Sequence, residues 1–283
     1  MKTDFLTLWV DDNVPFAQSI EANLKDWLDE KGFELKVSIH KDETGVLEEI
    51  KNKDIELIII DYKLPGEDGD VLIEKIRGNG CYQDIIFYSG GPLPEKRLDG
   101  VFFVSKGDAR TRIKELIELK LRRSSDFATL RGWIVADAIE LEMMLDEILL
   151  KCFNPRHELF ELQIVKRAGI LDFFKKQAII NSILTDELNR LGQIKDASER
   201  YQKLQECKEV FKSFEREVIH YRNAVAHGRV EKTPDGLKRV KTLVKNPEYF
   251  DFDENNLAQG RKNLRKQRDC LVMLRQFIVA ADE

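Results

Sequence analysis

Carboxylates stand at the ends of two short apolar runs near the start of the sequence. Asp11 and Asp12 directly follow the run at 5–10, and Asp61 closes the run at 55–61. If these runs are strands of one parallel sheet, the three carboxylates meet in the crevice at the carboxyl ends of the strands. Carboxylates held that close repel one another and need a cation, and all-oxygen ligands suit Mg²⁺. The spacing therefore predicts a magnesium site.

Two further polar side chains are expected at the same edge of the sheet. Ser89 follows a fourth apolar run, and Lys106 follows a fifth. A carboxylate beside Mg²⁺ can act as a nucleophile toward a phosphoryl group, and a lysine and a hydroxyl can hold the phosphoryl oxygens. These strand-end residues together are typical of a site that accepts a phosphoryl group.

A second candidate set lies in "YRNAVAHG" at 221–228, late in a long charged helical segment. Arg222 and Asn223 stand side by side, and His227 follows four residues after the asparagine. Two interpretations stay open at this point. The segment is an ordinary helix end, capped at His227 and Gly228, or it carries a small set of catalytic groups.

Helical spacing divides this segment into two faces. The face expected to pack on the core carries Phe211, Phe214, Val218, Tyr221 and Val225. The opposite face carries Arg216, His220, Asn223 and His227, and Arg222 lies at the border. The polar face contains no acid and would suit an anionic partner, although Arg216 is interpreted as a plain surface arginine. A core position for His227 is not expected.

The elements that must position the acidic residues form a β/α alternation. Apolar runs of strand type alternate with amphipathic helical segments and lie at 5–10, 34–39, 55–61, 84–91 and 100–108. This pattern predicts an α/β fold with a doubly wound parallel sheet. The connection between the fourth and fifth runs is too short for a full crossover helix. The fourth helix is therefore expected to be shortened or missing.

Strand-type runs disappear after about residue 124, and long amphipathic helices take their place. A hairpin is predicted from residue 229, with its Pro-Asp-Gly turn at 234–236, and a last helix from residue 255. We expect two domains, 1–123 with the doubly wound sheet and 124–283 as an all-α helical bundle with a small hairpin.

Composition narrows the class of protein. Charged residues make up 34% of the 283 residues and no apolar run is long enough for a transmembrane helix. The four cysteines lie far apart without CxxC spacing, which is typical of reduced thiols in a cytoplasmic protein. The net charge of −5 argues against non-specific coating of DNA. A local excess of lysine and arginine at 228–268 still allows contact with a polyanion.

The first 122 residues resemble the receiver domain of two-component response regulators. The matching segments are "WVDDN" (9–13), "IIIDYKLPGEDG" (58–69), "YSGG" (88–91) and "FFVSKGD" (102–108). The resemblance implies a flavodoxin-like fold and a sensor histidine kinase or small phosphodonor as partner. It implies that Asp61 is the phosphoacceptor. The Mg²⁺ ligands implied are Asp11, Asp12, Asp61 and the backbone carbonyl of Lys63.

The same resemblance gives roles to three further residues. It implies that Ser89 and Lys106 bind the phosphoryl group and that Phe103 is the switch aromatic. Lys106 is followed by Gly107, where the family usually has proline.

The second half resembles the HEPN superfamily of small helical-bundle domains. Its signature, an arginine, about four intervening residues and a histidine near the end of a long helix, is met by "RNAVAH" at 222–227. The resemblance implies a metal-independent endoribonuclease in which two protomers pair their motif helices and share one composite site. RNA and a second copy of the chain are thus expected partners. The implied catalytic residues are Arg222, Asn223 and His227, with His220 as an accessory candidate.

The chemistry of these residue types agrees with that role. Histidine can deprotonate the 2′-OH and protonate the leaving 5′-oxygen near neutral pH. Arginine is always charged and can stabilise the developing phosphorane charge. Asn223 could orient His227 or donate a hydrogen bond to the phosphate.

The leading hypothesis is a response regulator whose phosphorylation controls a HEPN-type ribonuclease. The alternative is a receiver with a non-catalytic helical module that binds a protein or a nucleotide. Specific binding of duplex DNA is not expected, because no helix-turn-helix is evident and residues 124–283 are nearly neutral.

Overall fold

The chain folds into two compact units, residues 2–126 and 127–283, which are described separately below as the N-terminal unit and the helical unit. The computed structural model describes residues 3–91, 100–123, 127–153, 157–165, 167, 170–193, 198–232, 238–241, 249–251 and 253–279. No helix among these residues has the length and apolarity that a membrane crossing requires.

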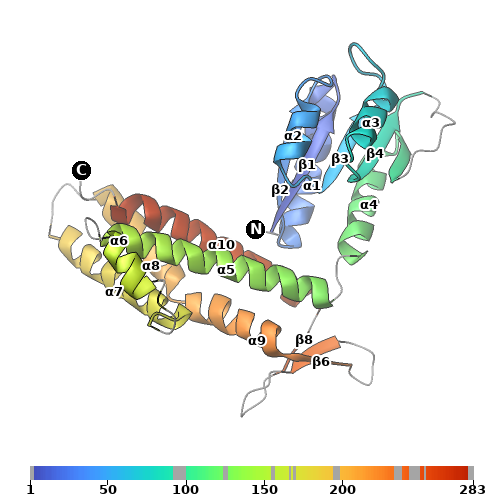
Figure 1. The fold of residues 1–283 in the computed structure, drawn as a ribbon. Coiled ribbons are helices and arrows are strands. Elements are labelled where there is room, and N and C mark those ends of the chain that lie inside the picture. The colour runs from blue at the N-terminus through green and yellow to red at the C-terminus, as the bar shows by residue number, and fades with distance from the viewer. Residues whose placement is uncertain are drawn as a thin grey trace. The chain divides into compact units, whose positions relative to one another are not determined.

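The N-terminal unit is built on a five-stranded parallel sheet (Figure 1). The strands have the order β2-β1-β3-β4-β5, which is the doubly wound, flavodoxin-like order. Their bounds are β1 Asp4–Val10, β2 Glu34–His40, β3 Leu57–Asp61, β4 Asp84–Ser89 and β5 Val101–Ser105. The predicted fold class is confirmed.

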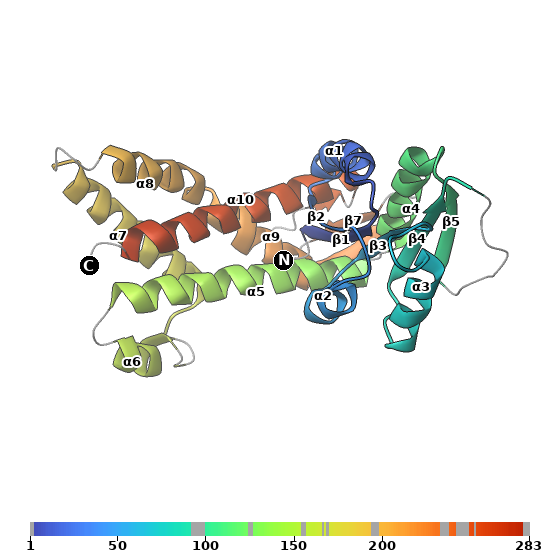
Figure 2. The same ribbon diagram turned by 90° about the horizontal axis from the view of Figure 1, so that it is seen from above.

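Helices cover both faces of this sheet (Figure 2). On one face, α1 (Val14–Glu30) and α4 (Ala109–Arg123) pack on the strands. On the other, α2 (Val46–Asn52) and α3 (Gly69–Gly78) do so. The strands are apolar in both directions because both of their faces are buried. The helix that the sequence predicts to be shortened or missing would connect β4 to β5. It would lie at residues 92–99, which are outside the described residues.

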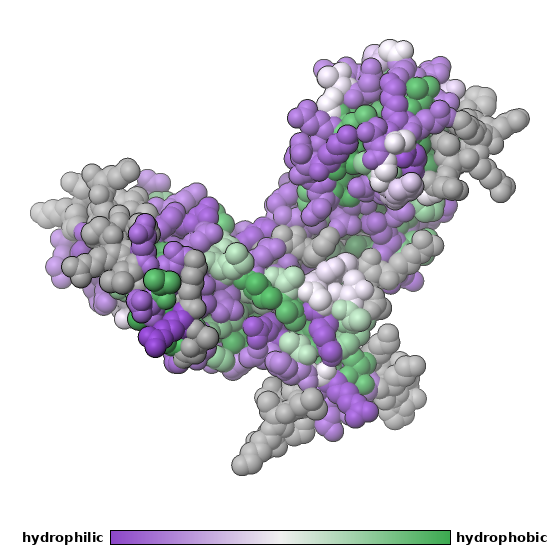
Figure 3. Space-filling model, in the orientation of Figure 1, coloured by the Kyte–Doolittle hydropathy of each residue, from purple (hydrophilic) through white to green (hydrophobic). Residues whose placement is uncertain are grey.

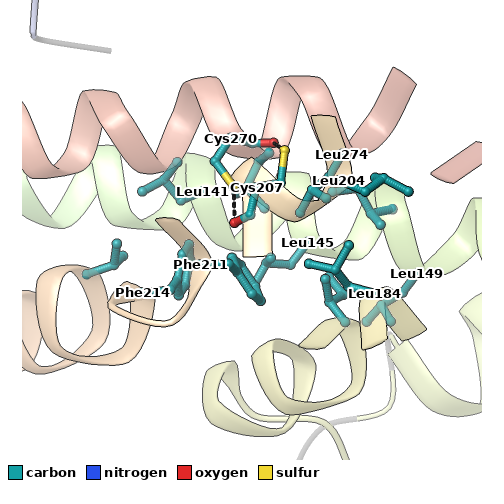
Figure 4. Packing of buried hydrophobic residues seen from close by; sticks show 14 of the residues in the cluster. Leu141, Leu145, Leu149, Leu184, Leu204, Cys207, Phe211, Phe214, Cys270 and Leu274 are labelled. Atoms are coloured by element: carbon teal, nitrogen blue, oxygen red, sulfur yellow. Dashed lines mark hydrogen bonds between the residues drawn. The ribbon is translucent and has the colours of Figure 1, made fainter. Parts of the chain in front are cut away.

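The helical unit packs several helices around one apolar core (Figures 1 and 4). The two longest, α5 (Phe127–Cys152) and α10 (Glu254–Val279), lie side by side. The others are α6 His157–Phe160, the π-helix η1 Glu161–Val165, α7 Phe173–Leu191, α8 Ser198–Phe211, the π-helix η2 Glu215–His220 and α9 Tyr221–His227. The core includes leucines of α5 and α7 and the aromatic rings of Phe211 and Phe214.

The predicted hairpin is confirmed as β6 (Arg229–Lys232) paired antiparallel with β7 (Lys238–Lys241). A third strand, β8 (Tyr249–Asp251), pairs with β7 and was not predicted. The expected turn at 234–236 lies outside the described residues.

One helix prediction is wrong. The sequence predicts a single helix through residues 197–228, but the structure divides it into α8, η2 and α9. A π-helix holds one residue more per turn than regular helical spacing allows, so Val218 and Ile219 are both buried. The predicted core face is otherwise confirmed, with Phe211, Phe214 and Val225 fully buried.

Most of the visible surface is hydrophilic, with hydrophobic residues gathered over α5 on the face shown in Figure 3. On this helix the exposed apolar side chains are Ile139 and Met143, 46% and 59% exposed. All four cysteines are free thiols, as predicted.

A buried lysine joins α5 to α7. The Lys176 ammonium lies 2.9 Å from Glu142 Oε1 and 3.0 Å from Asp146 Oδ2, and its side chain is only 7% exposed. Burial alone would lower the pKa of Lys176, but the hydrogen bonds with the two carboxylates raise it. The group is therefore charged, and its removal leaves two carboxylates unpaired.

We expect Lys176→Met to lower the free energy of unfolding by about 2–3 kcal/mol, less than a fully buried pair would cost, because the carboxylates are partly exposed. The matched control is Lys175→Met, whose ion pair with Asp172 is solvent-exposed and should contribute much less to stability. Urea unfolding followed by far-ultraviolet circular dichroism measures both. Equal effects of the two variants would contradict a role for the α5–α7 ion pair.

Candidate functional site

Three carboxylates converge at the carboxyl edge of the parallel sheet. Oxygen atoms of Asp11, Asp12 and Asp61 all lie within 4.8 Å of one another. Asp11 and Asp61 are buried, whereas Asp12 is exposed. The strand order explains this proximity, because β1 and β3 are hydrogen-bonded neighbours that end at the same edge. An all-oxygen set of this kind fits a hard divalent cation such as Mg²⁺.

Burial makes Asp11 the more unusual carboxylate. Burial raises its pKa above the ordinary value, against the hydrogen bonds that it accepts from the Tyr88 hydroxyl and the Asn13 backbone. The Asn13 N–H lies 2.9 Å from Oδ1. A bound cation would favour the ionised form of this group.

Lys106 faces the carboxylates. Its Nζ is 2.7 Å from Asp61 Oδ2 and 3.8 Å from Asp11 Oδ1. It also lies 4.9 Å from the ring centroid of Phe16 and 5.3 Å from that of Tyr88. The position comes from the register of β4 and β5, where Lys106 N donates to Ser89 O over 2.8 Å. The lysine is therefore fixed over Asp61.

The other predicted residues lie around this cluster. Ser89 is buried at the end of β4, and its Oγ accepts a hydrogen bond from Gly91 N over 3.0 Å. Phe103 on β5 packs edge-on against Phe87, with ring centroids 5.7 Å apart. Lys63 turns its side chain to Asp68, with Nζ 3.0 Å from Oδ1. An ammonium group cannot bind a cation, so its backbone carbonyl is the candidate ligand.

A glycine gives the loop after Asp61 its close packing. A Cβ atom on Gly69 would lie 2.2 Å from the Asp61 carbonyl oxygen and 2.8 Å from the Phe87 ring. Gly69 N also donates to Tyr62 O over 2.7 Å. The start of α3 can therefore lie directly beside the backbone of Asp61.

Sequence reasoning missed Tyr88. Its hydroxyl donates to Asp11 Oδ2 and accepts a hydrogen bond from Trp9 Nε1 over 2.8 Å. Burial, and then the hydrogen bond to Asp11, raise the pKa of Tyr88, so the hydroxyl keeps its proton. The available signal was a residue with a polar atom in the otherwise apolar run of β4, directly before Ser89.

The second candidate set lies at the end of α9 in the helical unit. His227 is exposed, Asn223 and Arg222 are half-buried, and Val225 on the opposite side is buried. Tyr221 is fixed by α10, where a Cβ atom on Gly260 would lie 2.4 Å from its hydroxyl. Arg216 and His220, on the preceding π-helix, are exposed.

Arg222 makes its contacts within the chain. Its NH1 donates to Asn223 Oδ1 over 2.8 Å, and its guanidinium lies 6.0 Å from the ring centroid of Phe173. Its Nε is buried, with no hydrogen-bond partner among the described residues. His227 projects from the last turn of α9 to the surface. The structure thus places Arg222 and Asn223 in contact, while His227 lies one turn further on.

The helix ends at His227, but Gly228 does not adopt the left-handed conformation typical of a glycine cap. Its φ is −75° and its ψ is 152°, an extended conformation. A Cβ atom here would lie 2.2 Å from Val240 Cγ1 and 2.3 Å from the Ala224 carbonyl oxygen. Glycine is required because the hairpin packs against the helix end. Arg131 of α5, also missed in the sequence, donates to the Gly228 carbonyl over 2.7 Å.

Gly228→Ala should therefore lower the stability of the helical unit by about 1–3 kcal/mol, as an overpacked core does. Gly132→Ala on α5 is the matched control, because a Cβ atom there meets nothing within 4 Å. It should raise stability by about 0.5–1 kcal/mol through helix propensity. Thermal unfolding measures both, and a neutral Gly228→Ala would contradict the tight packing.

No protein-family model matches the sequence, and no curated protein matches it. Among solved structures, the chain is similar to the receiver domain of the hybrid histidine kinase CckA, with 24% identity and a TM-score of 0.34 over 41% of this chain and 98% of that one. A CheY-like response regulator receiver domain protein from Methanospirillum hungatei has 23% identity and a TM-score of 0.33, covering 42% and 98%. The RcsB response regulator of Salmonella typhimurium has 15% identity and a TM-score of 0.36, covering 74% and 92%.

Proposed function

We propose that residues 1–123 are the receiver domain of a two-component response regulator and that phosphorylation of Asp61 controls a HEPN-type endoribonuclease in residues 124–283. The observation that carries the first part is the convergence of three carboxylates beneath Lys106. The second part is supported by the exposed His227 with Arg222 and Asn223 one turn before it.

In the receiver, an Asp61 carboxylate oxygen attacks the phosphorus of a phosphohistidine or an acyl phosphate. The bond between phosphorus and the donor breaks, and its electron pair leaves with the donor. Lys106 holds an oxygen of the transferred group, and the Ser89 hydroxyl donates to another. Asp11, Asp12, Asp61 and the Lys63 carbonyl would hold Mg²⁺, which neutralises charge on the phosphoryl oxygens.

In the helical unit, His227 removes the proton of a ribose 2′-OH, which attacks the adjacent phosphorus. The bond to the 5′-oxygen breaks, and a second histidine protonates that oxygen as it leaves. Arg222 stabilises the charge on the phosphorane. A single chain supplies one such histidine and one such arginine, so a homodimer through this unit completes the proposed site.

Phosphorylation would act by shifting the population between two states of the protein. In the sequence, only residues 124–126 separate α4 from α5. A change in the packing of α4 on the sheet therefore has a short covalent route to the helical unit.

The test is cleavage of a mixed RNA pool by the pure full chain with EDTA present, with and without prior phosphorylation by acetyl phosphate and Mg²⁺. We expect 5′-hydroxyl and 2′,3′-cyclic phosphate ends, formed at rates that differ between the two forms. No cleavage by either form would rule out the ribonuclease while leaving the receiver intact.

One observation favours the second candidate, a non-catalytic helical module that binds a protein or a nucleotide. Arg222 is engaged by Asn223 and Phe173, which is also what a structural arginine does. Binding of RNA or a nucleotide without any cleavage would support this alternative.

A further inference from the structure

Tyr88 connects the acidic cluster of the N-terminal unit to the apolar core beneath it. Its side chain is fully buried on β4, its ring lies 5.3 Å from Lys106 Nζ, and its hydroxyl contacts Asp11. Trp9, also fully buried, lies on the other side, with ring centroids 6.3 Å apart. Neither residue is among the proposed ligands or phosphoryl-binding groups.

The direction of the hydrogen bonds follows from the chemistry of the three groups. An indole N–H can only donate, so the Tyr88 oxygen accepts the bond from Trp9 Nε1, 2.8 Å away. An ionised carboxylate can only accept, so the single hydroxyl proton of Tyr88 goes to Asp11 Oδ2. The two hydrogen bonds therefore have one direction, with Trp9 donating to Tyr88 and Tyr88 donating to Asp11.

This arrangement distinguishes the two oxygens of Asp11. Oδ2 is occupied by the tyrosine, whereas Oδ1 accepts from Asn13 N over 2.9 Å and lies 3.8 Å from Lys106 Nζ. Lys106 donates a hydrogen bond to Asp61. Because Asp11 Oδ1 is the oxygen that approaches Lys106, it is also the oxygen that faces the other carboxylates. Tyr88 therefore fixes the rotation of the Asp11 carboxylate.

We infer that Tyr88 is a positioning residue for divalent-cation binding. We also infer that the environment of the Trp9 indole changes when a cation binds, because Trp9 is hydrogen-bonded to Tyr88. The inference rests on the proposed Mg²⁺ site at Asp11, Asp12 and Asp61. A residue that hydrogen-bonds to a metal ligand and orients it typically increases metal affinity by about 10–100-fold. Because Trp9 is fully buried, a response of its indole to Mg²⁺ does not come from contact with the ion, and the hydrogen bond to Tyr88 is the proposed route.

The first test compares Mg²⁺ affinity among variants of the full chain, taken from backbone amide resonances during titration with MgCl₂. Tyr88→Phe keeps the ring but removes the proton donor, and we expect about 10–100-fold weaker binding. Tyr62→Phe is the matched control, a tyrosine directly after β3 whose ring packs on Phe87, with centroids 5.7 Å apart, on the side of α2 and α3. It should bind Mg²⁺ as the wild type does. Trp9→Phe leaves the Tyr88 donor in place and should weaken binding less than Tyr88→Phe does.

The second test follows the wild type, and Trp9→Phe serves only to assign one resonance. In the ¹⁵N-labelled chain, the indole N–H resonance of Trp9, assigned by its loss in Trp9→Phe, should shift on addition of Mg²⁺. The indole of Trp27, which lies on α1 beside Lys31 and Lys114, should not shift.

Each failure has its own meaning. If the wild type binds no Mg²⁺, the proposed metal site is wrong, and so is the proposed role of Tyr88. If the wild type binds Mg²⁺ but Tyr88→Phe binds it equally well, only the role of Tyr88 is overturned. If the indole N–H resonance of Trp9 does not shift while Mg²⁺ saturates the site, the proposed link between Trp9 and the metal site is wrong. Equal losses in Trp9→Phe and Tyr88→Phe would assign the effect to core packing instead.

Discussion

Asp61→Asn should take up no phosphoryl group from acetyl phosphate or from a histidine kinase, although the protein should stay folded. The amide has no ionised oxygen to attack phosphorus, and it removes one of the three negative charges that would hold Mg²⁺. The Lys106 ammonium, 2.7 Å from the carboxylate in the wild type, loses its closest partner. Intact-protein mass spectrometry after incubation with acetyl phosphate and MgCl₂ measures the result.

Asp70→Asn is the matched control for this experiment. Asp70 lies in the first turn of α3, outside the carboxylate cluster, and its Oδ1 accepts a hydrogen bond from Val71 N. This variant should be phosphorylated to the wild-type extent. Uptake by Asp61→Asn equal to the wild type would assign the phosphoryl group to another residue and overturn the receiver proposal.

The second large effect concerns RNA cleavage. His227→Ala should slow cleavage by about 100–10,000-fold, the usual contribution of a general acid or base. Arg222→Ala should cost about 100–1,000-fold, because it removes the charge that stabilises the phosphorane. Both are measured as initial rates on a labelled RNA with EDTA present, which keeps the metal site of the N-terminal unit from contributing.

The two variants differ in what they do to the fold. His227 is exposed, so its removal should leave thermal stability unchanged and give the cleaner result. Arg222 contacts Asn223 and Phe173, so its loss also perturbs packing, and Arg222→Lys serves to retain the charge. Arg216→Ala is the matched control, since that side chain is 79% exposed, and it should change the rate less than about twofold. Wild-type rates in His227→Ala would exclude catalysis by this motif.

Much of the acidic site could be predicted because its residues follow a simple rule of position. Apolar runs mark the strands, and the residues after them must gather at one edge of a parallel sheet. Asp11, Asp61, Ser89 and Lys106 follow this rule, and their proximity needs no knowledge of side-chain rotation. The role of Tyr88 does need it, because its hydroxyl reaches Asp11 across the sheet from a strand that is apolar on both faces.

The π-helix η2 could not be predicted for a different reason. Regular helical spacing fits residues 211–227 well enough to place the core residues, so the local sequence gives no sign of an interruption. The structure instead shows a distant residue at this place. Gln267 of α10 is fully buried and donates to Val210 O, Ser213 Oγ and Glu217 Oε2 over 3.0, 3.1 and 2.8 Å. Tertiary contacts of this kind decide the local winding.

The position of η2 affects how the motif that follows it responds to a change in the length of the helix. A π-helix takes up one residue more than an α-helix over the same turn, so the chain on both sides of it can keep its packing. Arg222, Asn223 and His227 all lie downstream of this single turn. Deletion of one residue within η2 would let regular helical winding form there and leave the orientation and the mutual spacing of all three residues unchanged. The motif is therefore expected to keep its placement when the helix before it is shortened by one residue.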